Sequence, residues 1–127
     1  MFWTILQVAV GGAIGAVGRY LTGVAAIRVF GGSFPTGTLG VNVVGSFLMG
    51  IAFVLFMTRS GEVSRMVPFV MTGLLGGYTT FSAFSLDFWT LLEKDRWVAA
   101  TAYLGGSIVL SIAALIVGIL LARGVAG

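Results

Sequence analysis

Residues 73–85 read Gly-Leu-Leu-Gly-Gly-Tyr-Thr-Thr-Phe-Ser-Ala-Phe-Ser, and they lie inside an uncharged run from Met66 to Leu86. The run is long and apolar enough to cross a bilayer as a helix, but its centre, residues 76–80, favours helix poorly. Paired glycines cost about 1 kcal/mol each relative to alanine, and threonine is restricted at χ1. A helix that breaks in lipid frees backbone groups that only protein, water or an ion can satisfy. We therefore expect a broken transmembrane helix with a functional break.

The composition indicates an integral membrane protein. Of the 127 residues, 58% are hydrophobic and 9% are charged, and the mean hydropathy is +1.10. Soluble domains do not have this composition. We expect one domain over residues 1–127, because a chain of this length leaves no room for a separate module. The seven cations are scattered singly along the chain, so we expect no nucleic acid partner.

Few side chains could carry catalysis. The chain has no histidine and no cysteine, which removes thiolate and imidazole chemistry and the common ligands of zinc and copper. Its four carboxylates are those of Glu62, Asp87, Glu93 and Asp95. We expect that the protein is not an enzyme.

Charged and turn residues divide the chain into four apolar segments. They cover residues 2–27, 37–57, 66–92 and 97–122, joined by connections at 28–36, 58–65 and 93–96. Each segment exceeds the roughly 20 residues that span a bilayer. The sequence therefore predicts an all-α membrane protein with four transmembrane helices and both termini on one side. Small residues such as Gly11, Gly15 and Gly45 would let these helices pack closely, within a subunit or between subunits.

The cations show almost no asymmetry between the two sides of the membrane. Arg59, Arg65 and Arg123 fall on the side of the termini, and Arg28, Lys94 and Arg96 fall on the other. Because this asymmetry sets orientation, the chain could insert both ways and pair as an antiparallel dimer. Weak asymmetry also occurs in proteins with one fixed topology, so both arrangements stay open.

The predicted break could serve ions of either sign. The half-helix before it ends in carbonyl oxygens, which suit a small hard cation, and the half-helix after it begins with N–H groups, which suit an anion. Phe81, Phe84 and Phe88 then follow at helical spacing on one face. The positive edge of a phenyl ring can help a dehydrated anion through an apolar throat. The alternative is that these rings face lipid or the core.

Two further features, an amide with a threonine one turn before it and a stripe of hydroxyls, are candidates for the wall of a polar pathway. Asn42 is a lone amide in the second segment, one turn after Thr38; it could donate to an anion or bond to a neighbouring helix. In the fourth segment Tyr103, Ser107 and Ser111 form one hydroxyl stripe, although serine often bonds to its own helix.

Arg19 is the only cation well inside an apolar segment. It could reach an interface, cap carbonyl groups or supply positive potential at a pore mouth.

These motifs resemble those of the Fluc (CrcB) fluoride channels of bacteria. The matching stretches are residues 11–20 (GGAIGAVGRY), 37–42 (GTLGVN) and 73–85, and the resemblance covers the whole chain. There are two departures: Ala83 stands where many members have threonine, and Tyr78 is bulky for its place between the glycines and threonines.

The resemblance implies an antiparallel, dual-topology homodimer with two fluoride pores in the bacterial inner membrane. It also implies a central structural sodium ion, held by backbone carbonyls of Gly76 and Thr79 from each subunit, and a structural or pore-mouth role for Arg19. The channel would export cytoplasmic fluoride passively. The expected fluoride pathway comprises Thr38, Asn42, Thr80, Phe81, Ser82, Phe84, Tyr103, Ser107 and Ser111.

Two other functions compete with this one. A small multidrug or guanidinium-type exporter is also a four-helix antiparallel dimer, but cation/proton exchange needs a carboxylate in the membrane. Those proteins use a glutamate in the first helix, where this chain has none. The third possibility is a helix-packing subunit of a larger complex, without transport of its own.

Overall fold

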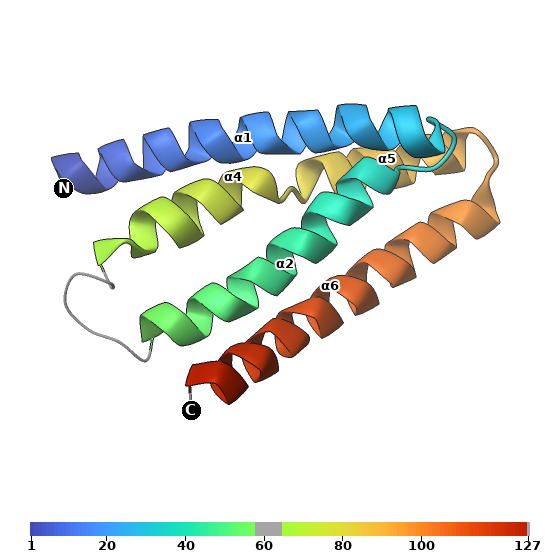
Figure 1. The fold of residues 1–127 in the computed structure, drawn as a ribbon. Coiled ribbons are helices and arrows are strands. Elements are labelled where there is room, and N and C mark those ends of the chain that lie inside the picture. The colour runs from blue at the N-terminus through green and yellow to red at the C-terminus, as the bar shows by residue number, and fades with distance from the viewer. Residues whose placement is uncertain (58–64, 127) are drawn as a thin grey trace.

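The computed structural model describes residues 1–57 and 65–126. Its helices are α1 (Phe2–Phe30), α2 (Thr36–Met57), η1 (Pro68–Leu75), α4 (Gly76–Tyr78), α5 (Ser82–Glu93) and α6 (Trp97–Ala126). The described residues contain no strand. The helices form four crossings of a bundle, and both termini lie at the same end (Figure 1). The all-α class and the four crossings, with the third one broken, are thus confirmed.

The helix boundaries differ from the predicted ones by a few residues. Helix α1 continues to Phe30 and stops at Gly31, whose φ of 81° favours glycine and whose N–H bonds to the Ile27 carbonyl at 2.8 Å. Helix α6 continues to Ala126 rather than ending at residue 122. The connection predicted at residues 58–65, with Arg59 and Glu62, lies outside the described residues except for Arg65.

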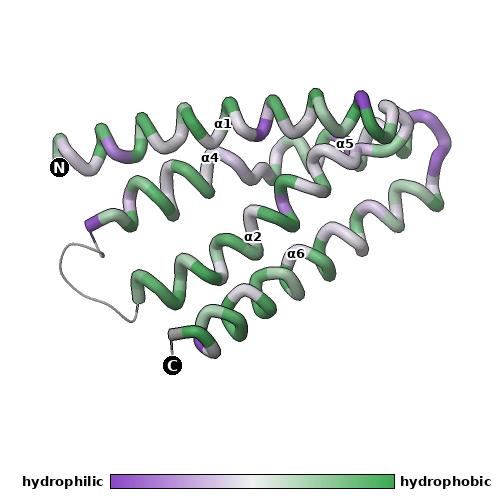
Figure 2. The backbone as a smooth tube through the Cα atoms, in the orientation of Figure 1, coloured by the Kyte–Doolittle hydropathy of each residue, from purple (hydrophilic) through white to green (hydrophobic). Residues whose placement is uncertain are grey.

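Helices α1, α2 and α6 are each long and apolar enough to cross a membrane. The third crossing is assembled from η1, α4 and α5 in succession. Hydrophilic residues gather at one end of the bundle, in the turn between α5 and α6 (Figure 2). This distribution is typical of a membrane-spanning bundle, whose middle section faces hydrocarbon.

Glycines bring α1 against the first half of the third crossing. A Cβ atom on Gly11 would lie 2.5 Å from the Phe69 carbonyl oxygen, and one on Gly15 would lie 2.2 Å from the Leu74 carbonyl oxygen. Both distances are too short for any side chain, so the two backbones are in direct contact. Packing within the subunit therefore accounts for both glycines.

Glycines that the sequence did not single out join α2 to α6. A Cβ on Gly50 would lie 2.2 Å from the Leu115 carbonyl oxygen, and a Cβ on Gly118 would lie 2.2 Å from the Phe47 carbonyl oxygen. The bundle thus consists of two tightly packed layers, one of α1 with η1 and α4, the other of α2 with α6. The broken part of the third crossing faces the second layer.

Candidate functional site

The third crossing is interrupted at residues 79–81. Thr79 is extended, with φ −86° and ψ 159°, and α5 begins at Ser82. The two glycines, Gly76 and Gly77, remain helical, so the break starts three residues later than the predicted segment. Thr79 explains the delay, because its N–H and its hydroxyl both bond to the Leu75 carbonyl, at 3.1 and 2.9 Å.

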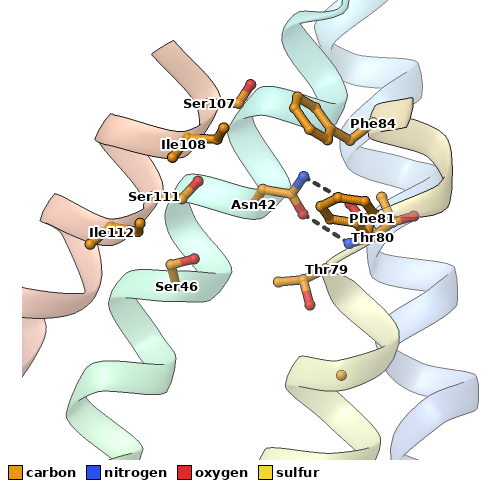
Figure 3. A pocket seen from close by; sticks show the side chains of 11 residues that line it. Asn42, Ser46, Thr79, Thr80, Phe81, Phe84, Ser107, Ile108, Ser111 and Ile112 are labelled. Atoms are coloured by element: carbon orange, nitrogen blue, oxygen red, sulfur yellow. Dashed lines mark hydrogen bonds between the residues drawn. The ribbon is translucent and has the colours of Figure 1, made fainter. Parts of the chain in front are cut away.

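The side chain of Asn42 satisfies the backbone of the break. Its Oδ1 accepts a hydrogen bond from the Thr80 N–H at 2.8 Å, and its Nδ2 donates to the Thr80 carbonyl at 2.9 Å (Figure 3). The amide thus pairs with Thr80 as a neighbouring β-strand would. Of the two interpretations from sequence, the structure shows a hydrogen bond to a neighbouring segment, here the break in the third crossing. One Nδ2 hydrogen is left for another acceptor.

Helix α1 supports the other side of the break. The Nε of Arg19 donates to the Gly77 carbonyl at 3.2 Å, so the structure shows the carbonyl-capping role among the three considered for this arginine. Tyr78 lies one residue further on, and its hydroxyl is 3.0 Å from that of Thr22. Because Thr22 donates to the Gly18 carbonyl, Tyr78 is the donor in this pair. The bulky Tyr78 is therefore anchored to α1.

A groove of about 490 Å³ opens beside the break, between α2, α6 and the third crossing (Figure 3). It brings together six of the nine expected pathway residues and both residues expected to bind the cation. Its lining residues are Asn42, Ser46, Gly76, Thr79, Thr80, Phe81, Phe84, Ser107, Ile108, Ser111 and Ile112. From the sequence Ser46 was expected only as a small residue for helix packing, although its position one turn after Asn42 was a usable signal for the groove.

Two hydroxyls in this groove have no hydrogen-bond partner among the described residues. The Oγ atoms of Ser107 and Ser111 are both buried and unbonded, and Ser107 as a whole is only 5% exposed. The expected alternative, a bond back to the serine's own helix, is therefore not made at either position. A buried hydroxyl without a partner costs about 1–3 kcal/mol, which a bound acceptor would recover.

The spacing predicted three phenylalanine rings on one face of a helix, and the structure shows that they differ in burial and surroundings. Phe81 precedes α5 and is 77% exposed, whereas Phe84 is 6% exposed. Their ring centroids are 5.6 Å apart at an interplanar angle of 65°. Phe88 packs against the core cluster around Phe84. Only Phe81 and Phe84 therefore line the groove.

Three expected pathway residues do not line this groove. Tyr103 is 1% exposed, beneath the rings of Phe34 and Phe84, and its hydroxyl donates to the Asp87 carboxylate at 3.1 Å. Thr38 lines a second cavity of about 250 Å³ together with Asp87. Ser82 is exposed at the start of α5.

Comparison with known proteins identifies the family. Residues 6–119 match the family described as "CrcB-like protein, Camphor Resistance (CrcB)". The chain belongs to the CrcB family. Similar proteins named "Fluoride-specific ion channel FluC" come from Ruegeria sp. (strain TM1040), with 55% identity over 126 residues, and Cereibacter sphaeroides (strain ATCC 17029 / ATH 2.4.9), with 53% over 124. Each match covers 98% of both chains.

A third relative of the same name, from Agrobacterium fabrum, is 49% identical over 119 residues, which is 94% of this chain and 95% of that protein. Membership of the CrcB family confirms the resemblance drawn from the three motifs. The relatives are named as ion channels and not as enzymes, which agrees with the expectation from composition. With its apolar helices, the chain is a multi-pass bacterial membrane protein.

Proposed function

We propose that this CrcB protein is a fluoride channel, as its relatives' names indicate for them, and that the groove beside the break is part of the pathway. The observation that carries the proposal is the set of unused donors there. The Ser107 and Ser111 hydroxyls are buried without partners, and Asn42 keeps one amide hydrogen. These groups face an apolar surface that includes Phe81 and Phe84.

The chemistry of the groove suits a small anion. Fluoride holds its water strongly, so a pathway must replace that water with several hydrogen-bond donors. Hydroxyl and amide groups supply such donors, and the phenyl ring edges of Phe81 and Phe84 add positive potential. Helix α5 also presents its N-terminal end next to these residues, where unpaired N–H groups favour negative charge.

The pathway requires a second copy of the chain in this proposal. Phe81 is 77% exposed, and the groove that it lines is open on one side. An antiparallel copy would close the groove and bring its own, which gives two pores per dimer. The near-equal numbers of cations on the two sides of the chain support insertion in both orientations.

The residues at the break fit the proposed structural sodium ion. In a continuous helix the Gly76 carbonyl would bond to the Thr80 N–H and the Thr79 carbonyl to the Ala83 N–H. Here those N–H groups bond instead to Asn42 and to the Thr80 hydroxyl, so the two carbonyl oxygens are released. Carbonyl oxygens are suitable ligands for a hard cation, and two copies would supply four. The ion would contribute positive charge between the subunits.

Export of fluoride needs no energy source beyond the membrane potential. An interior-negative potential drives a monovalent anion outward by about 2.3 kcal/mol per 100 mV. Proton-coupled exchange would need an ionisable carboxylate on the pathway. None of the groove-lining residues is acidic, and the Asp87 carboxylate accepts a hydrogen bond from Tyr103 outside the groove. A groove lining without a carboxylate therefore favours a passive channel over a proton-coupled exporter of the small multidrug or guanidinium type.

Anion efflux from liposomes that contain the purified protein tests the proposal. We expect rapid release of fluoride and little release of chloride. Phe81→Ile and Asn42→Asp should abolish fluoride release while the protein elutes unchanged on size exclusion. Phe2→Ile is the matched control, because Phe2 is also exposed, at 72%, but lies outside the groove. Equal permeation of both halides, or none, would contradict the proposal.

A further inference from the structure

We infer that Asn42 and the Thr80 hydroxyl are positioning residues for the cation site, which couples that site to the anion pathway through one hydrogen-bonded unit. The inference rests on the proposed function, since it concerns the same break. It assigns Asn42 a task that is separate from lining the groove.

Hydrogen bonding determines which carbonyls are released. The Thr80 N–H, which would close a helical bond to the Gly76 carbonyl, donates to Asn42 Oδ1 at 2.8 Å. The Ala83 N–H, which would close the bond to the Thr79 carbonyl, donates to Thr80 Oγ1 at 3.2 Å. Each of the two carbonyls thus loses its helical partner to a specific side chain. Without these side-chain acceptors, a continuous helix would reclaim both carbonyls.

The second bond of Asn42 fixes this arrangement. Its Nδ2 donates to the Thr80 carbonyl at 2.9 Å, so the Thr80 backbone is held at both its N–H and its C=O. A flipped amide would set N–H against N–H and oxygen against oxygen, so only one orientation is compatible with these distances. Rotation of Thr80 back toward helical geometry would break both bonds.

Arg19 separates a neighbouring carbonyl from the pair. Gly77 also lies in the last helical turn before the break, but its carbonyl accepts a hydrogen bond from Arg19 Nε at 3.2 Å. A carbonyl that is bonded to a guanidinium is a poor ligand for a cation. Arg19 therefore directs the Gly77 carbonyl to α1, and Gly76 and Thr79 are the residues of this turn that line the groove.

Coupling follows because Asn42 belongs to both sites. It lines the groove, and it also holds the peptide geometry that releases the carbonyls. A change in how Asn42 or Thr80 is held should therefore alter both sites, and any coupling between the two bound ions is reciprocal in binding free energy.

Thermal unfolding of the purified protein, followed by tryptophan fluorescence while sodium replaces N-methylglucamine, tests the inference. A ligand that binds the folded state raises its stability with concentration, so the unfolding temperature of the unchanged protein should rise with sodium. Thr80→Val and Asn42→Leu should need about tenfold more sodium for the same rise, which corresponds to ~1.4 kcal/mol.

Ser107→Ala is the matched control. Ser107 lines the same groove but has no hydrogen bond to the break. This variant should change fluoride efflux and leave the sodium response as it is. A similar shift in Ser107→Ala would mean general loosening of the groove and would overturn the inference.

The remaining outcomes separate the two proposals. If sodium stabilises the unchanged protein and Thr80→Val responds identically, the coupling is wrong and the cation site stands. If sodium has no effect on the unchanged protein, the cation site fails and the coupling fails with it, whatever the anion assay shows. Should Asn42→Leu not fold, Thr80→Val decides, because valine keeps the shape of threonine and loses only its hydroxyl.

Discussion

Gly45→Ala is expected to damage the break from the opposite helix. An ideal Cβ on Gly45 would lie 2.2 Å from Thr79 Cγ2, whereas carbon atoms in contact sit about 3.5 Å apart or more. One of the two groups must therefore move by at least ~1.3 Å. The Thr79 side chain cannot simply rotate away, because its hydroxyl bonds to the Leu75 carbonyl. We expect the backbone of the break to shift instead.

The stability change can be bounded from two opposing effects. Overpacking of this kind costs about 1–3 kcal/mol, and replacing a helical glycine by alanine returns about 1 kcal/mol. The expected net loss is up to about 2 kcal/mol, together with a sharp fall in fluoride efflux. Gly40→Ala is the control on the same helix. Its Cβ would meet nothing within 4 Å, so it should be neutral or slightly stabilising.

A double-mutant cycle tests the mechanism. Thr79→Ser deletes Cγ2 and keeps the hydroxyl, so it should recover the stability that Gly45→Ala loses, with a favourable coupling of about 1–2 kcal/mol. Thermal unfolding of the purified variants and efflux from liposomes give the two readouts. The reasoning is refuted if Gly45→Ala behaves like Gly40→Ala, or if the losses of the two single variants simply add.

Three further variants separate function from stability. Ser107→Ala should lower fluoride efflux and leave the unfolding temperature unchanged or higher, because it removes an unpartnered buried hydroxyl that costs about 1–3 kcal/mol. A clear loss of stability would mean that the hydroxyl has a protein partner. Tyr103→Phe should cost about 1–3 kcal/mol in thermal unfolding, since Asp87 loses its donor, and no change would show that this bond is not made. Arg19→Leu should lower the free energy of unfolding by ~1–3 kcal/mol, because it leaves the Gly77 carbonyl unpaired. Its control, Arg28→Leu at an exposed position, should be nearly neutral in the same assay.

The sequence predicted the break because its cause is local. Adjacent glycines and threonines in an otherwise apolar segment weaken a helix wherever they occur. The break starts at Thr79 rather than at Gly76, because the N–H and the hydroxyl of Thr79 both donate to the Leu75 carbonyl. These two hydrogen bonds extend the helix by about one turn. The pairing of Asn42 with Thr80 joins residues 38 apart in sequence, and no local pattern shows it.

The structure places two of the three residues of the predicted hydroxyl stripe on the groove. Ser107 and Ser111 line the groove, but Tyr103 is covered by Phe34 from the loop between α1 and α2. Phe81 and Phe84 differ in burial, although their rings are in edge contact and both line the groove. Phe81 already has helical dihedral angles, and its carbonyl accepts the Ser85 N–H. Which neighbouring segment covers a ring is a tertiary feature that the hydrophobic pattern does not encode.

The polar groups at the break, rather than the exposed apolar side chains, would drive pairing of the proposed two copies. Phe81 is largely exposed, but lipid is as apolar as another subunit, so its burial supplies little driving force in a membrane. The carbonyl oxygens of Gly76 and Thr79 differ, because hydrocarbon offers them no partner and each unsatisfied group costs several kcal/mol. A cation shared between two copies would remove that cost from both at once. Association should therefore weaken when sodium is withdrawn and should respond only weakly to Phe81→Ile.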